Sequence, residues 1–163
     1  MIRNLIVIDN NSRPIVSANF GECHSLGQDD ELISGFISAV YSFSKMLAAD
    51  SLDQIQMRGL TFIIKSRGTL IFALSADDPN RATHEKTLVK IIDLFEDLYD
   101  YYSTCVDPDV DTSVFHEFPR FLVDQSILQP NCGKYTDCKD CPNSERDLPL
   151  RELTKELDKR LDA

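Results

Sequence analysis

The fold of this chain is decided by one stretch, Leu60-Thr61-Phe62-Ile63-Ile64-Lys65-Ser66-Arg67-Gly68-Thr69-Leu70-Ile71-Phe72-Ala73-Leu74. Two runs inside it, residues 60–64 and 70–74, are apolar on consecutive positions, which predicts strands that are buried on both faces. Residues 65–68 separate the runs with polar side chains and a glycine, so they predict a turn. The stretch therefore predicts an antiparallel hairpin inside a sheet that helices cover.

Three further stretches predict strands. Residues 5–8 are apolar throughout, which again indicates burial on both faces, and they lead into a turn-rich segment. Residues 14–20 follow as a hairpin partner, and Pro14 suits the first residue of an edge strand. Residues 53–59 alternate in polarity, as in a half-exposed edge strand. Ile55 and Met57 point to one side of it, and Gln54, Gln56 and Arg58 to the other.

Apolar residues at spacings of three and four predict helices over residues 30–49 and 81–103, and a shorter one at about 118–128. Asp29 or Asp30 can cap the first helix. Its amphipathic stripe consists of Leu32, Ile33, Phe36, Ile37, Val40, Phe43 and Leu47.

These elements predict an α+β domain over residues 1–128, followed by a cysteine-rich loop and a short amphipathic helix over residues 129–163. Numbered along the chain, the five antiparallel strands take the order 2-1-5-4-3, because the two half-polar strands then lie at the edges. Helix 30–49 is expected on one face of the sheet, and the two later helices on the other.

Composition limits the possible partners. The chain has 163 residues, 42% of them apolar, and a formal net charge of -10. An acidic chain repels phosphate backbones and anionic lipid surfaces, so a nucleic-acid partner is not expected. No apolar run has the length of a membrane span or of a signal-peptide core, and we expect a cytoplasmic protein.

One segment carries a resemblance to a known family. It reads Leu88-Val89-Lys90-Ile91-Ile92-Asp93-Leu94-Phe95-Glu96-Asp97-Leu98-Tyr99, and an acidic loop and Phe115-His116-Glu117-Phe118-Pro119-Arg120-Phe121-Leu122-Val123-Asp124 follow it. With the order β-β-α-β-β-β-α-α, this resembles the longin or SNARE-like domains, and adaptor small chains in particular. Pro119 departs from the third helix of that family, although the first turn of a helix accepts proline.

The resemblance implies a binding platform without an active site. Longin-like domains bind small Ras-like GTPases, partner domains of longin or roadblock type, or transport machinery. The residues agree with this implication, because the chain has no glycine-rich phosphate loop, no His-Glu-x-x-His motif and no plausible Ser-His-Asp set. Its histidines are dispersed, and His84 is expected to be a solvated helix residue. We expect a non-enzymatic interaction module that binds its partner at Gln54, Gln56 and Arg58. The alternative is that this edge is only solvated or is covered by a loop.

Three of the five cysteines lie close together, as Cys132-x5-Cys138-x2-Cys141. Because Cys-x-x-Cys can place two thiolates on one tetrahedral metal, this spacing predicts bound zinc. The fourth ligand would come from Cys105, His116, Cys23 or His24. Structural thiols, an iron–sulfur cluster, a redox pair and a disulfide are the alternatives, and a metal-binding or redox-sensing protein is the second functional hypothesis.

Overall fold

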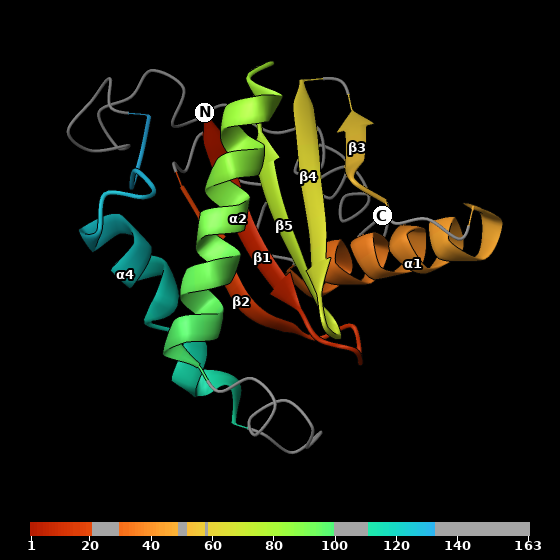
Figure 1. Cartoon of the computed structure of the whole chain (residues 1–163), viewed down its shortest axis with the longest axis horizontal. Coiled ribbons are helices and arrows are strands. Elements are labelled where there is room, and N and C mark those ends of the chain that lie inside the picture. Colours follow the sequence, from red (N-terminus) through yellow and green to blue (C-terminus); the bar gives the residue numbers. More distant parts are fainter. Residues whose placement is uncertain (21–29, 49–51, 58, 100–110, 133–163) are drawn as a thin grey trace, which may run out of the picture.

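A computed structural model describes residues 1–20, 30–48, 52–57, 59–99 and 111–132 of the chain (Figure 1). Its centre is one five-stranded antiparallel sheet with the order β2-β1-β5-β4-β3. The α+β class and the strand order predicted from the sequence are therefore confirmed. The strands are β1 (Ile2–Ile8), β2 (Pro14–Asn19), β3 (Gln54–Met57), β4 (Leu60–Arg67) and β5 (Leu70–Ala76).

The two central strands explain this order. β5 is buried along its whole length, and β1 is buried from its second residue onward. β1 pairs with both β2 and β5, so that Leu5 lies opposite Ala18 on one side and Leu74 on the other. A strand with water on neither face gains most from apolar side chains on consecutive residues. Residues 5–8 and 70–74, which were predicted to be buried on both faces, thus lie in interior strands of the sheet.

One set of buried side chains joins the sheet to the later helices, α2 (Arg81–Leu98) and α4 (Phe118–Asp124), and to the 3-10 helix at Thr112–Phe115. Phe95 lies at its centre. The Phe95 ring makes an edge contact with Phe72 of β5 at 5.5 Å between centroids, and it also contacts the rings of Tyr99, Phe115 and Phe118. In Figure 1, α2 lies over the sheet with α4 beside it.

A second set contains the alternate residues of the same strands. Ile6 and Ile8 of β1 cluster with Ile37 and Tyr41 of α1 (Asp30–Ala48), whereas Leu5 and Val7 belong to the first set. Successive side chains of a strand point to opposite faces, which is why neighbouring residues of β1 belong to different sets. In the view of Figure 1, the later half of α1 extends past the edge at β3.

The apolar stripe of α1 is not the face that the sheet buries. Of its seven residues only Ile37 is buried, while Ile33 and Val40 are half-buried and the other four are exposed. The buried side of α1 includes Ser34, Ser38 and Tyr41 instead. The Ser34 hydroxyl donates a hydrogen bond to the Ser12 carbonyl at 3.2 Å, which ties this side of the helix to the β1–β2 turn.

Some element boundaries also differ from the prediction. β4 continues through residues 65–67, which were expected to form a turn, and the turn shrinks to Gly68 and Thr69. Gly68 makes this possible with a φ of 60°, and Lys65 and Arg67 form ion pairs with acidic residues of α2. α4 ends at Asp124, before the expected residue 128, and α2 ends at Leu98, after which the backbone of Tyr99 is extended. Residues 49 and 100–103 of the predicted helices lie outside the described ranges. Pro119 occupies the first turn of α4, where it is tolerated.

Candidate functional site: the β3 edge

β3 forms one edge of the sheet. Among the strands that the structure describes it pairs with β4 alone, in a register that sets Gln54 opposite Ile63 and Gln56 opposite Thr61. Its last two residues, Gln56 and Met57, are exposed, and the first two are half-buried. The sequence prediction that this strand lies at an edge is confirmed.

The register shows which backbone groups of β3 point outward. The amide of Ile64 donates to the carbonyl of Asp53 at 2.9 Å, so the backbone of residue 53 faces β4. Backbone groups of an antiparallel strand alternate between the two sides, so residues 55 and 57 also face β4. The amide and carbonyl of Gln54 and Gln56 therefore face the open edge. An added strand could bind all four groups.

The side chains of β3 divide between the two faces. Ile55 packs with the α1 cluster, and Met57 lies on the same face with 42% of its surface exposed. The alternation puts Gln54 and Gln56 on the face opposite to Ile55 and Met57. Of the three partner-binding residues predicted from the sequence, Gln54 is half-buried, Gln56 is exposed, and Arg58 lies outside the described residues.

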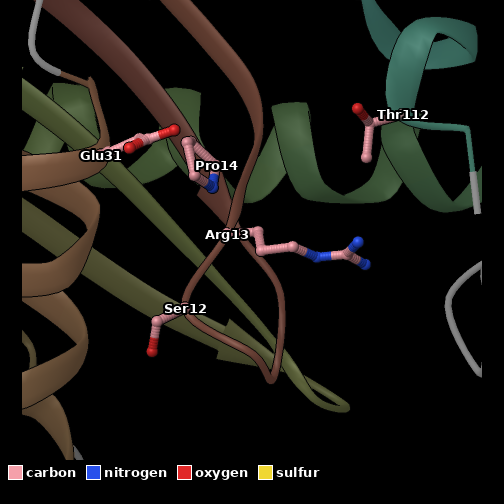
Figure 2. A pocket seen from close by; sticks show the side chains of 5 residues that line it. All are labelled: Ser12, Arg13, Pro14, Glu31 and Thr112. Atoms are coloured by element: carbon pink, nitrogen blue, oxygen red, sulfur yellow. The ribbon is translucent and has the colours of Figure 1, made fainter. Parts of the chain in front are cut away.

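A cavity of about 410 Å³ lies between the β1–β2 turn, the first turn of α1 and the 3-10 helix (Figure 2). It is lined by Ser12, Arg13, Pro14, Glu31 and Thr112. The Arg13 guanidinium is bound to buried Asp9 at 2.7 Å, and the same carboxylate accepts the backbone amides of Asn11 and Arg13. These bonds stabilise the turn that lines the cavity, and we propose no reaction there.

A cluster of charged groups joins the start of β1 to the loop between β5 and α2. The Asp77 carboxylate binds the N-terminal ammonium at 2.8 Å and Nε of Arg3 at 2.7 Å. Burial alone raises the pKa of Asp77, but the hydrogen bonds and charges of these two cations outweigh burial and lower that pKa below its ordinary value. Both cations favour the ionised carboxylate, so the cluster stabilises the fold by fastening β1.

His84 belongs to this cluster, and the expectation that it is solvated is wrong. Its side chain is only 10% exposed, and its Nε2 lies 2.8 Å from the Asp78 carboxylate. The residue is the fourth of α2 and precedes buried Leu88 by four residues, so helical periodicity places it on the buried side of the helix, and this spacing was the sign in the sequence that the side chain is covered. Burial lowers the pKa of His84, the N-terminal ammonium lowers it further, and Asp77 opposes both effects.

This lowered pKa predicts a pH dependence of stability. The unfolded chain takes up a proton at His84 near pH 6.5, about the ordinary value, before the folded protein does. The free energy of unfolding should therefore be retained above that pH and fall as the pH drops below it. Chemical denaturation between pH 8 and 5 measures this slope. His84→Gln should reduce the slope of the free energy of unfolding against pH, and His116→Gln, at an exposed position, should leave that slope unchanged. Equal slopes in both variants would contradict the assignment.

The predicted metal site falls mostly outside the described residues. Cys132 lies at the end of the described part, half-buried and with a free thiol, whereas Cys138 and Cys141 lie outside it. Among the proposed fourth ligands only His116 is described, and it is exposed. Within the described residues no three histidine, cysteine, aspartate or glutamate side chains are arranged so that they could hold a metal ion.

Comparisons with known proteins identify no family. No protein-family model matches the chain, and a search of curated proteins gives no match. Among the described helices, none is both long and apolar enough to cross a lipid bilayer.

Proposed function

We propose that the protein is a non-enzymatic interaction module of the longin type, which binds a small Ras-like GTPase or a partner longin- or roadblock-type domain. The observation that carries this proposal is the open edge of β3, where the backbone groups of Gln54 and Gln56 face outward. Main-chain hydrogen bonds to an added strand give affinity without a deep pocket.

Other features support the same proposal. The order of the elements and the two packed sets of side chains agree with a longin-like domain in which α1 covers one face of the sheet and α2 and α4 the other. The charged groups of the Asp77 cluster are engaged with one another, which is typical of a structural role. Regulation of a small GTPase in membrane trafficking is the form of this function that the resemblance favours.

The proposal predicts that one backbone amide at the edge controls binding. Gln56→Pro removes an outward amide that makes no bond to β4, so the monomer should fold with little loss of stability. Binding to a partner strand should weaken at least tenfold, about 1.4 kcal/mol. The measurement is titration of the full chain against Ras-like GTPases loaded with GTP or GDP and against longin-type domains.

Gln56→Ala is the matched control, because it removes the side chain and keeps the amide. It should bind within about twofold of the original protein, since exposed side chains at a strand edge contribute little to the pairing. If both variants bind as well as the original, the edge is not the site. If no GTPase or longin-type domain binds the original protein in either nucleotide state, the proposed function is wrong.

Zinc binding by Cys132, Cys138 and Cys141 is retained as a separate proposal, because the Cys132 thiol is free to coordinate. Chelator-free protein should then contain about one zinc per chain. The combined substitution Cys138→Ser and Cys141→Ser should release it, because a tetrahedral site cannot lose two thiolates and persist. Elemental analysis makes the measurement, and Val89→Ala, which removes no candidate ligand, is the comparison. A zinc content far below one per chain in the original protein would end this proposal.

A further inference from the structure

The outward face of α1 is apolar. It exposes Leu32 at 61%, Phe36 at 45%, Phe43 at 60%, Met46 at 84% and Leu47 at 72%. Residues 32–44 contain no charged side chain. A helix on the surface of a protein ordinarily carries charged and polar residues on the side away from the core. α1 has the composition of a helix that is covered on two sides, and the sheet covers one.

The size of this face is that of a binding surface. The five side chains expose about 600 Å², if a fully exposed large apolar side chain is taken as roughly 200 Å². The largest apolar patch of a typical monomer is about 300–600 Å². Two such faces in contact would bury about 1,200 Å², which reaches the lower limit of stable protein–protein interfaces.

The spacing of the largest side chains indicates what covers the face. Leu32 precedes Phe36 by four residues, and Phe43 precedes Leu47 by four. Read in reverse, the pattern is the same, with its centre between Ala39 and Val40. At 3.6 residues per turn these four side chains lie on one side of the helix. In a two-fold symmetric contact, a residue i of one copy that contacts residue j of the other implies that residue j of the first copy contacts residue i of the second.

We propose that the outward face of α1 binds the same face of a second copy of this chain, with the two helices antiparallel. The two-fold axis then passes between Ala39 and Val40. It sets Leu32 of each copy opposite Leu47 of the other, and Phe36 of each copy opposite Phe43 of the other. The face brings no charges together, although each copy carries a net charge of -10. Membrane-surface helices carry basic residues beside the apolar face, and residues 32–44 supply none.

This inference goes beyond the proposed function, because it uses α1 and not the edge of β3. The two surfaces give different results in the same variants. Gln56→Pro should leave the self-association unchanged, and substitutions in α1 should abolish it. If Gln56→Pro abolishes the self-association and the α1 variants do not, the contact lies at the edge strand and the inference is overturned.

The test is sedimentation of the full chain over a range of concentrations. The original protein should form dimers with a dissociation constant of micromolar order. Phe36→Glu and Phe43→Lys, each alone, should raise that constant by about 1,000-fold, because symmetry places each change in the contact twice. Both positions are partly exposed, so both variants should fold, which circular dichroism checks.

The decisive sample is an equimolar mixture of these two variants. In the antiparallel register one chain's new carboxylate meets the other's new ammonium, while the remaining pair of phenylalanines still meets. The mixture should dimerise where each variant alone does not. Val114→Glu, at a position 50% exposed in the 3-10 helix, is the control and should remain dimeric.

Three results would overturn the inference. One is that the original protein stays monomeric up to a concentration about a hundred times the micromolar dissociation constant expected of an interface of this size. Another is dimerisation that both α1 variants retain. The third is a mixture that stays monomeric, since the antiparallel register requires the charges to meet.

Discussion

Phe95→Ala is expected to lower the free energy of unfolding by about 4 kcal/mol, the middle of the range for removing a buried phenylalanine. Phe95 has no exposed surface and contacts four aromatic rings, from β5, from the segment after α2, from the 3-10 helix and from α4. The loss combines the transfer free energy of the ring with the cavity that it leaves. Rings held by three separate elements cannot all move into that cavity.

Urea denaturation of the original and the variant measures this loss. Val89→Ala is the matched control, because it shortens an apolar side chain of the same helix at a position 38% exposed. The control should change stability by less than about 1 kcal/mol. A loss below about 1.5 kcal/mol for Phe95→Ala would mean that the three elements around the ring do not form one cooperative core.

The order of the strands could be predicted because a strand that is buried on both faces carries apolar side chains at consecutive positions. β1 and β5 are apolar at adjacent positions, and each pairs with two strands. β3 alternates, and it pairs with one. The boundaries were harder to predict, since Lys65 and Arg67 are polar residues that extend β4 by pairing with α2 across the sheet surface.

The side of α1 that faces the sheet could not be predicted, because two arcs of that helix are apolar. Sequence periodicity gives the larger arc, through Leu32, Phe36 and Phe43. The sheet takes the arc of Ile37 and Tyr41, which includes small serines. Which arc packs depends on the shape of the sheet and on the Ser34–Ser12 hydrogen bond, neither of which is visible along the helix. The uncharged run of residues 32–44 was the available sign that both sides of the helix are apolar.

At the candidate site, alternation alone predicted that β3 is an edge strand and that Gln54 and Gln56 point to the same side of it. It could not tell which backbone groups face outward, because that depends on the register with β4. The cluster around Asp77 was also missed. Met1 and Arg3 lie more than seventy residues before Asp77 in the chain, and the pairing of β1 with β5 brings them together.

That cluster gives the second large prediction. Asp77→Ala should lower the free energy of unfolding by about 2 kcal/mol, because it leaves the Arg3 guanidinium without its carboxylate in a buried position. The Arg3 side chain is 6% exposed. Breaking a fully buried pair costs about 3–5 kcal/mol, and the value here is smaller because water still reaches the Asp77 side chain, which is 22% exposed.

The double variant Arg3→Met with Asp77→Ala distinguishes a stranded charge from lost packing. Met replaces the buried stem of Arg3 and leaves no guanidinium to solvate, so the double variant should recover about 1 kcal/mol relative to Asp77→Ala. Among the residues that the structure describes, Nη1 of Arg3 has no hydrogen-bond partner even in the original protein, which makes this recovery larger. A double variant as unstable as the sum of the two single variants would show that the charges are not coupled.

Acid supplies an independent check on the same pair. The lowered pKa of Asp77 means that its ionised form stabilises the folded state above about pH 4 and that this contribution is lost as the pH falls through the folded-state pKa. The stability difference between the original protein and Asp77→Ala should therefore be constant near neutrality and shrink in acid. A difference that stays the same down to the acid transition would assign the loss to packing, because only the ionised carboxylate can compensate the charge of Arg3.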